Sequence, residues 1–470
     1  MTDRPLDIHM TAICGMGMAP LAVLLSQAGH RVRGSDKAAF PPMSDALAAA
    51  GLEITIGFAA ENLDPEPDLV IIGNAVSRDN VEAAEVERRG LERISFPEAV
   101  SRFFLDGRRS LVVAGTHGKT TTTGMLARAL QTAGFDPGYL VGGRVRDLGA
   151  LAYAGEPPYF AIEGDEYDTA YFDKGPKFLH YRPAAAIVTS LEFDHADIYD
   201  DVEQIEGSFR RLVELLPEDG PLVACAEYER VRTLAAGHAA AVTYATGGDA
   251  DWTLGDIDVS AAGTRAPLVY RGRHEADLEL GLLGSMNALN ALAVYALGRE
   301  LGVDGAGMLD GLRGYRGAAR RQEILGEARG VVVIDDFAHH PTAVAATVSA
   351  VRAAFADRRL VAVFEPRSNT SRRAIFQSQY TDALFGADVV ALSEVFRKAN
   401  DPLTDDEALS PARITEELGH RGVDAFVGAG PDELVDRLTT TLRPNDVALC
   451  MSNGDFGNLP RRLLANLEKN

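Results

Sequence analysis

The sequence predicts an α/β protein with three domains, of which the first and the last are Rossmann-like. Short apolar runs alternate with amphipathic stretches along the chain, as strands alternate with helices in doubly wound sheets. Many of these runs end in glycine and polar residues, as strands do at the carboxyl edge of a parallel sheet. The length of 470 residues suits three domains, which we place at 1–107, 108–314 and 315–470.

Composition excludes several classes of protein. The net charge is −22, from 46 basic and 68 acidic residues, which argues against nucleic acid or an anionic membrane surface as a partner. No apolar run approaches the ~18 residues of a membrane-spanning helix, and the N-terminus does not read as a signal peptide. The three cysteines, Cys14, Cys225 and Cys450, lie far apart and form no CxxC pair. This spacing indicates reduced core residues and not a disulfide framework or a zinc site. We therefore expect a cytoplasmic protein with small-molecule partners.

The first domain opens with a βαβ-like unit. A strand at Ile8–Cys14 leads into the turn Gly15-Met16-Gly17, and a helix at Ala19–Ala28 leads into a second strand, Arg31–Ser35. Asp36 then lies about 20 residues past the glycine turn, where nucleotide sites place a ribose-binding acid. A turn used only for packing is the alternative, because proline replaces the third glycine of the fingerprint.

The rest of this domain adds a second polar turn. The strand Asp68–Ile72 ends in Gly73–Ser77, at the sheet edge where open α/β sheets bind ligands. A capping box formed by Ser95 and Glu98 predicts the start of a helix that extends to Phe104 and closes the domain.

The second domain begins with a phosphate-binding pattern. An apolar strand, Leu111–Gly115, is followed by Thr116-His117-Gly118, by Lys119, and by a helix from Thr120. Backbone N–H groups at such a helix start bind phosphate, the lysine reaches the β- and γ-phosphates of ATP, and the threonine hydroxyl contacts Mg²⁺. The spacing G-x-x-G-K-T is shorter than the usual one, and an ordinary strand-to-helix turn is the alternative.

Two acidic clusters follow later strands of this domain. Tyr159–Ile162 leads into Glu163–Asp168, and Ala184–Thr189 leads into a segment from Glu192 to Asp197. Both clusters lie at the sheet edge predicted for the phosphate loop. Carboxylates beside ATP phosphates need Mg²⁺ to bridge them, so the clusters predict a Mg²⁺ site, with solvated loops as the alternative.

Short β-like stretches, including Leu254–Val259, predict a peripheral ribbon over 237–280. The helix Ser285–Leu301 then carries Asn287 and Asn290, which lie on one face and either read an adenine edge or cap the helix. Arg320 and Arg321 are candidate γ-phosphate contacts or surface ion-pair partners.

The third domain repeats the strand-then-polar pattern. Val331–Ile334, Leu360–Phe364 and Val447–Met451 end in DDFAHH, EPRSNT and SNGDFG, and Val389–Leu392 and Ala425–Val427 are further strands. Three such domains meeting over one ATP favour a ligase that activates a carboxyl group as an acyl phosphate and excludes water on closure.

Six segments spread over nearly the whole chain together resemble the Mur ligase family. They are GTHGKTTT (115–122), EGDEYD (163–168), EFDHADIYDD (192–201), N-x-x-N (287–290), DDFAHHPTA (335–343) and EPRSNT (365–370). Within that family, PPMS (41–44), PDLVIIGNA (67–75), YFDK with KFLHY (171–181) and MSNG-x-FG (451–457) are similar to the branch that adds a tripeptide.

The resemblance implies an enzyme of peptidoglycan recycling with ATP and Mg²⁺ as cofactors. We expect it to be a monomer or weak homodimer. It would join L-Ala-γ-D-Glu-meso-diaminopimelate to the lactyl carboxyl of UDP-N-acetylmuramate. The alternative within the family is the branch that adds L-alanine. A folylpolyglutamate synthetase, an NAD-dependent oxidoreductase and a nucleotide switch are less consistent with the motifs, because none of them needs both the glycine-turn domain and the GKT loop.

The resemblance also assigns roles to individual residues. The catalytic set is Lys119, His195 and Arg321, and the metal ligands are Thr120, Glu163 and His195. The expected ATP contacts are Gly115, Thr116, His117, Gly118, Lys119, Thr120, Thr121, Asn287, Asn290, Arg320, Arg321, Asp336 and His339. The expected UDP-sugar contacts are Gly15, Met16, Gly17, Met18, Ser35, Asp36, Asn74, Ala75 and His117. Candidates for binding the peptide are Arg367, Ser368 and Ser452.

Two residues depart from the family pattern, and one missing residue type agrees with some branches of the family. Ser190 stands where relatives usually have asparagine, and Met286 where histidine commonly precedes the adenine-helix asparagine. The segment Glu206–Leu216 has no lysine that could be carbamylated, which agrees with the branches that bind UDP-N-acetylmuramate.

Overall fold

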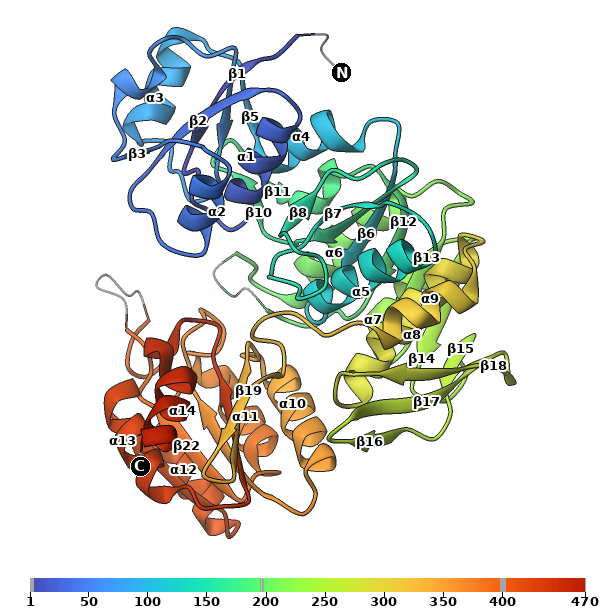
Figure 1. The fold of residues 1–470 in the computed structure, drawn as a ribbon, viewed down its shortest axis with the longest axis vertical. Helices are drawn as coiled ribbons and strands as arrows, with labels where there is room; N and C mark the ends of the chain where they lie inside the picture. Colours follow the sequence, from blue (N-terminus) through green and yellow to red (C-terminus); the bar gives the residue numbers. More distant parts are fainter. Residues whose placement is uncertain (1–3, 195, 197, 398–402, 470) are drawn as a thin grey trace. The chain divides into compact units, whose positions relative to one another are not determined.

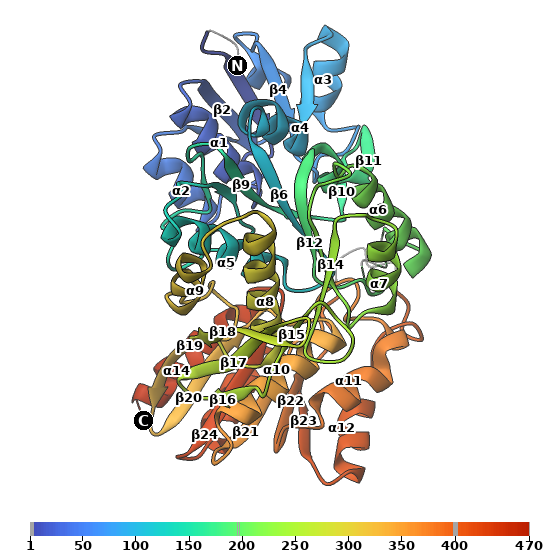
Figure 2. The ribbon, with the colours of Figure 1, turned by 90° about the vertical axis from the view of Figure 1, so that its right-hand side faces the viewer.

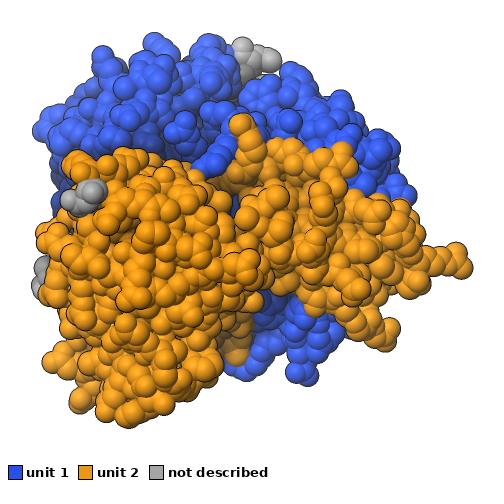
Figure 3. Space-filling view, turned by 60° about the horizontal axis from the view of Figure 1, so that its bottom comes forward, with its two compact units in different colours: residues 1–191, 203–244, 293–311 blue, residues 192–202, 245–292, 312–470 orange. Residues whose placement is uncertain are grey.

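The computed structural model describes residues 4–194, 196, 198–397 and 403–469 (Figure 1). The chain divides into two compact units (Figure 3). Unit 1 comprises Met1–Leu191, Glu203–Tyr244 and Ala293–Gly311, and unit 2 comprises Glu192–Val202, Ala245–Leu292 and Leu312–Asn470. Within the described residues, the structure contains no helix that is both long and apolar enough to cross a membrane.

The N-terminal part of unit 1 is a parallel sheet with the order β3-β2-β1-β4-β5. Its strands are β1 (Asp7–Thr11), β2 (Arg31–Asp36), β3 (Ile54–Ile56), β4 (Leu69–Ile72) and β5 (Arg93–Ser95). Its helices are α1 (Met18–Gln27), α2 (Met43–Ala49), η1 (Ala60–Leu63), α3 (Val81–Arg89), α4 (Phe96–Val100) and η2 (Ser101–Leu105). This order confirms the predicted Rossmann-like sheet.

One predicted boundary in this sheet was wrong. The first strand ends at Thr11 and not at Cys14, because Ala12 has a φ of 66° and turns the chain toward Ser35. The helix predicted from Ser95 to Phe104 is helical as far as Leu105, α-helical to Val100 and π-helical over the last turn. The capping box of Ser95 and Glu98 is confirmed.

The central sheet of unit 1 places the strand before the phosphate loop between two parallel neighbours. The order is β14-β13-β12-β6-β9-β7, all parallel, with β8 antiparallel to β7. The strands are β6 (Arg109–Ala114), β7 (Gly138–Leu140), β8 (Ala152–Tyr153), β9 (Tyr159–Gly164), β12 (Pro183–Val188), β13 (Leu222–Cys225) and β14 (Ala241–Ala245). The other elements are α5 (Lys119–Thr132), the hairpin β10 (Asp168–Ala170) with β11 (Asp173–Pro176), η3 (Lys177–His180), α6 (Val202–Glu214) and α7 (Glu229–Ala236).

Unit 2 contains the predicted peripheral ribbon as antiparallel strands. These are β15 (Trp252–Leu254), β16 (Asp258–Ser260), β17 (Gly263–Tyr270) and β18 (Arg273–Leu280). The single strand predicted at Leu254–Val259 was wrong. It breaks at Gly255, whose N–H bonds to Pro267 O at 2.8 Å and whose missing side chain leaves room for the Pro267 ring. Helix α8 (Ser285–Glu300) follows, with its first half in unit 2, and most of the next helix, α9 (Gly305–Arg313), belongs to unit 1.

The C-terminal part of unit 2 is a second Rossmann-like sheet (Figure 2). Its order is β19-β20-β24-β21-β22-β23, with only β19 antiparallel. The strands are β19 (Glu323–Ala328), β20 (Val331–Asp336), β21 (Arg359–Phe364), β22 (Val389–Ser393), β23 (Asp424–Gly428) and β24 (Asp446–Met451). The helical elements are α10 (Pro341–Ala354), η4 (Ala374–Phe376), α11 (Gln377–Leu384), α12 (Pro411–His420), α13 (Pro431–Thr441), η5 (Phe456–Asn458) and α14 (Leu459–Lys469).

Successive side chains along a strand point to opposite faces of this sheet. Val332 and Ile334 pack with α10 and α11 on one face, whereas Val331 and Val333 pack with α13 and α14 on the other. Strand β24 lies between β20 and β21, so the polar residues that follow these three strands meet at one edge.

Candidate active site

The phosphate loop connects β6 to α5, as the sequence predicted. Gly115 and Gly118 have φ values of 142° and 82°, which only glycine adopts readily. A Cβ atom on Gly115 would lie 2.1 Å from the Thr189 hydroxyl oxygen, so this position also lacks space for a side chain. Gly118 is the N-cap of α5, and the first-turn N–H groups of the helix begin at Lys119.

The loop is anchored to the residues that follow β12. The N–H of His117 donates to Ser190 Oγ at 2.8 Å, and the N–H of Thr116 donates to Ser190 O at 3.3 Å. Thr189 Oγ1 donates to the carbonyl of His117. Ser190 is fully buried, so the serine that departs from the family pattern serves here as a loop anchor.

Each acid of the EGDE segment contacts a different partner. Thr120 Oγ1 donates to Glu163 Oε2 at 3.2 Å, and the N–H of Gly142 donates to Glu163 Oε1. Asp165 pairs with Lys177 at 3.4 Å, and Glu166 pairs with Lys119 at 2.8 Å.

These acids determine the charge state of Lys119. Burial alone lowers the pKa of Lys119, but Glu166, Asp165 and Glu163 together raise it above its ordinary value. Lys119 therefore stays positively charged in a site where its side chain is only 12% exposed.

Thr120 and Glu163 form an oxygen pair suited to a hard divalent cation. The hydroxyl and carboxylate oxygens are in contact, and Mg²⁺ prefers oxygen ligands of this kind. The residues present therefore fit the predicted ion. The third predicted ligand, His195, lies outside the described residues.

The two turns predicted for the UDP-sugar lie side by side in the N-terminal sheet. The N–H of Gly73 donates to Thr11 O at 3.0 Å, which joins the turn containing Asn74 and Ala75 to the end of β1. Asp36 Oδ2 accepts the N–H of Cys14 at 2.8 Å and so holds the Gly15–Gly17 turn. Met16 is 62% exposed on that turn, whereas Met18 is buried at the start of α1.

Ser35 does not face the turn surface. Its buried hydroxyl donates to Glu82 Oε2 at 2.6 Å. Glu82 is fully buried and also accepts hydrogen bonds from Thr11 at 2.9 Å and Asn62 at 2.6 Å, and it contacts His9 Nε2 at 3.1 Å. Sequence reasoning missed this network because nothing about an isolated glutamate in a helix signals it.

In unit 2, the asparagines of α8 are buried at 7% and 5% exposure. Asn287 Nδ2 donates to Leu283 O at 2.9 Å and to Gln322 Oε1 at 3.0 Å. This contact links the start of α8 to the segment that carries the two arginines.

Arg320 and Arg321 lie over the ring of Phe337, with guanidinium carbons 5.3 and 4.4 Å from its centre. Asp336 accepts the N–H groups of Gln322 and Ala338, both at 2.7 Å. Burial raises the pKa of Asp336, while these two backbone bonds oppose the shift. The arginine segment is thus held against the end of β20.

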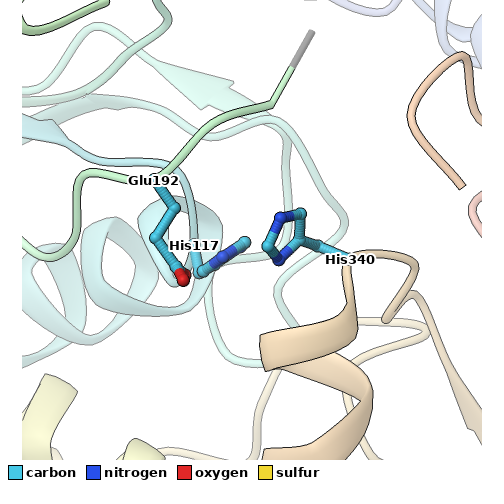
Figure 4. A group of neighbouring side chains, drawn as sticks. All are labelled: His117, Glu192 and His340. Carbon is cyan, nitrogen blue, oxygen red and sulfur yellow. The ribbon is translucent and has the colours of Figure 1, made fainter. Parts of the chain in front are cut away.

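The segment that begins with Glu192 is anchored to other loops of unit 2. Thr342 Oγ1 donates to Glu192 Oε1 at 2.9 Å, and His340 Nε2 lies 3.3 Å from Phe193 O. Thr370 donates to Asp194, and His339 Nε2 lies 3.9 Å from the same carboxylate. Figure 4 draws Glu192 and His340, together with His117 from the loop of unit 1.

The predicted peptide-binding residues surround the ends of β21 and β24. Arg367 Nη1 lies 3.0 Å from Asp455 Oδ1 and 3.5 Å from Glu365 Oε1. Its guanidinium carbon lies 4.3 Å from the centre of the Phe396 ring.

Buried Ser452 donates its hydroxyl to Glu365, whose side chain is also buried. By contrast, the Ser368 hydroxyl bonds to Ser371 Oγ at 2.9 Å and closes a local turn. Arg367 and Ser452 therefore meet through Glu365, which sequence reasoning did not single out.

Comparison with known proteins assigns the chain to a family. Three family models match consecutive segments: "Mur ligase family, catalytic domain" at residues 7–108, "Mur ligase middle domain" at 113–298 and "Mur ligase, glutamate ligase domain" at 320–454. An Escherichia coli protein named UDP-N-acetylmuramate–L-alanyl-γ-D-glutamyl-meso-2,6-diaminoheptandioate ligase is 38% identical over 98% of both chains. This chain belongs to the Mur ligase family.

Other Mur ligases match along the whole chain. A Pelotomaculum thermopropionicum UDP-N-acetylmuramate–L-alanine ligase is 34% identical over 100% of this chain and 99% of its own. The murein peptide ligase from Psychrobacter arcticus has a TM-score of 0.71 at 32% identity and covers 99% of both chains. The predicted fold class and the prediction of an ATP-dependent, amide-forming Mur ligase are confirmed.

Proposed function

We propose that this Mur ligase joins the tripeptide L-Ala-γ-D-Glu-meso-diaminopimelate to UDP-N-acetylmuramate, in the cytoplasm and during peptidoglycan recycling. The observation that carries the proposal is the 38% identity, over 98% of both chains, to an E. coli ligase named for this acceptor. A Haemophilus influenzae ligase of the same name is 36% identical over 98% of this chain.

A second candidate is the L-alanine ligase of the same family. The solved L-alanine ligase from Thermotoga maritima has a TM-score of 0.80, above the 0.71 of the Psychrobacter arcticus murein peptide ligase, although its sequence identity to this chain is only 26%. The experiment that separates the two supplies purified protein with UDP-N-acetylmuramate and ATP plus either tripeptide or L-alanine. Faster phosphate release with L-alanine would overturn the tripeptide proposal.

The proposed reaction has two steps. A lactyl carboxylate oxygen attacks the γ-phosphorus of ATP, so that ADP leaves and an acyl phosphate forms. The peptide amine then attacks the acyl carbon, inorganic phosphate leaves, and the amine loses a proton as the amide forms. Both steps build negative charge on phosphate oxygens, and the demand on the protein is positioning and charge neutralisation.

The central domain supplies these charges in our proposal. Lys119 contacts the β- and γ-phosphates, and the first N–H groups of α5 add the field of the helix N-terminus. Thr120 and Glu163 would hold Mg²⁺, which neutralises phosphate charge when bound. Arg321 and Arg320 are the proposed γ-phosphate contacts, and His195 the proposed ligand of a second ion.

The remaining nucleotide roles are also proposals. Asn290 and Asn287 would read the adenine edge, and Asp336 would hold the hinge through its two backbone hydrogen bonds. In the UDP-sugar site, Gly15, Gly17, Asn74 and Ala75 would contact the ligand directly. Ser35 and Asp36 would act through the turn, because their side chains bond to Glu82 and Cys14.

Arg367 is the proposed anchor for a carboxylate of the tripeptide. Its guanidinium is fixed by Glu365, whose side chain is 8% exposed, and by the ring of Phe396. Its other partner, Asp455, is 78% exposed and can be exchanged for a substrate carboxylate. An arginine held this way binds a carboxylate through two parallel hydrogen bonds. Free L-alanine offers one carboxylate, whereas the tripeptide offers several.

A further inference from the structure

The ammonium of Lys119 is fully engaged within unit 1. Its Nζ lies 2.8 Å from Glu166 Oε2, 3.2 Å from Glu166 Oε1 and 2.7 Å from the carbonyl oxygen of Gly115. An ammonium carries three N–H donors, and these three acceptors match them in number. The side chains are buried, at 12% exposure for Lys119 and 2% for Glu166, so water screens the pair weakly.

The other acids of this segment already serve other groups. Glu163 is bonded to Thr120 and to the N–H of Gly142. Asp165 pairs with Lys177, whose Nζ also lies 5.0 Å from the centre of the Tyr167 ring. Glu166 therefore has a distinct relation to the phosphate lysine, which neither the loop motif nor the proposed Mg²⁺ pair requires.

We propose that Glu166 is the resting counter-ion of Lys119, and that nucleotide phosphates must displace it. The inference rests on the proposed role of the loop in binding ATP. Before nucleotide binds, Glu166 holds the lysine charged and pointed at the loop. When the nucleotide binds, phosphate oxygens replace the carboxylate oxygens on Nζ, and Glu166 gives up its ion pair. Glu166 thus positions Lys119 and lowers the affinity for nucleotide.

This exchange predicts a specific dependence on Mg²⁺. Free ADP brings its full negative charge close to a buried carboxylate, and the two repel each other. A bound divalent cation offsets part of that charge, so the repulsion is smaller for the Mg²⁺ complex. Neutralising Glu166 should therefore strengthen binding of metal-free ADP more than binding of Mg²⁺–ADP.

The test is calorimetric titration of the full chain with ADP, with Mg²⁺ and with EDTA. We expect Glu166→Gln to bind metal-free ADP about tenfold more tightly than the wild type, and Mg²⁺–ADP only about threefold more tightly, as a nearby unit charge predicts. Glu166→Asp keeps the charge and should bind within about twofold of the wild type.

The matched control is Asp168→Asn. It removes the same charge from the same segment, but Asp168 pairs with the exposed Lys174 at 2.9 Å. The control should bind ADP like the wild type. An equal gain in ADP affinity for Asp168→Asn would show that the effect comes from net charge alone, and would overturn the proposal. Unchanged or weaker ADP binding by a Glu166→Gln protein that melts normally would also overturn it.

If Glu166→Gln does not fold, Glu166→Ala carries the same expectation, since it also removes the carboxylate. Failure of the wild type itself to bind ADP would instead contradict the proposed function.

Discussion

Ser190 accepts the backbone N–H of His117 at 2.8 Å and thereby fixes the middle of the phosphate loop. Replacing Ser190 with alanine leaves this partly buried donor without its acceptor, which costs about 1 kcal/mol of folding stability. We also expect the KM for ATP to rise about fivefold, because a misplaced loop binds phosphate less well. Thermal melting and steady-state kinetics measure the two effects. Ser378→Ala, at an exposed position on α11, should change neither.

Removal of Lys119 should separate ligation from UDP-sugar binding. Lys119→Ala is expected to lower ligation by about 100-fold or more, since the phosphate charge is no longer neutralised. Binding of UDP-N-acetylmuramate should stay within about twofold, because the proposed UDP-sugar site lies on the N-terminal sheet. Calorimetry with the UDP-sugar and an assay of phosphate release test this. Loss of both functions in a protein that melts normally would contradict the division of roles.

The ion pair with Glu166 adds a stability effect to the same substitution. Lys119→Ala removes the cation that compensates a buried carboxylate, which costs about 3 kcal/mol. The double variant with Glu166→Gln should recover most of that stability and none of the ligase activity. Chemical denaturation of both proteins measures the difference, and equal instability of the two would show that the pair does not behave as inferred.

Arg367 should control the affinity for the acceptor. Arg367→Lys keeps the charge but loses the planar fork, so we expect the KM for the tripeptide to rise about tenfold. The KM for ATP should remain unchanged. Arg358→Lys is the matched control, because Arg358 contacts Glu327 and the carbonyl of Gly330 near the opposite end of the sheet. A tripeptide KM unaffected by Arg367→Lys would remove this residue from the proposed peptide site.

The buried carboxyl of Asp335 should make the folded protein lose stability as the pH rises. Burial raises the pKa of Asp335 from 3.8 to about 6, although Arg320 opposes the shift. The folded state therefore holds the proton more tightly than the unfolded state. The stability contributed by protonated Asp335 is present below pH 3.8 and is lost as pH rises through about 6.

The variant Asp335→Asn does not titrate and should escape this loss. Its stability relative to the wild type should increase from pH 4 to pH 6 by about 1–3 kcal/mol and then stay constant. Urea unfolding at several pH values measures the trend. A constant difference across this range would mean that Asp335 titrates in the folded protein as it does in the unfolded one.

Features encoded by neighbouring residues could be predicted from the sequence. The strand, glycine turn, Lys119 and helix of the phosphate loop follow one another directly, and the capping box of Ser95 and Glu98 spans one helical turn. The alternation of strands and helices likewise indicated the fold class. These signals are local, so a pattern of residues is enough to identify them.

Features that depend on distant partners could not be predicted in this way. Glu82 contacts His9, Thr11 and Ser35, which lie 73, 71 and 47 residues away in the sequence. Glu166 reaches Lys119 across 47 residues, and Glu365 reaches Ser452 across 87. The motifs marked where the acids are, whereas only the sheet order and register decide which cation or hydroxyl each acid meets.

The proposed function depends on the acceptor being a tripeptide. The most direct measurement is a competition in one tube, with UDP-N-acetylmuramate, ATP, Mg²⁺ and equal concentrations of tripeptide and L-alanine, followed by mass spectrometry of the UDP-linked product. We expect UDP-N-acetylmuramoyl-tripeptide to predominate, and Arg367→Lys to lower its yield. Predominant UDP-N-acetylmuramoyl-L-alanine would contradict the proposed tripeptide acceptor and identify the chain as an L-alanine-adding member of its family.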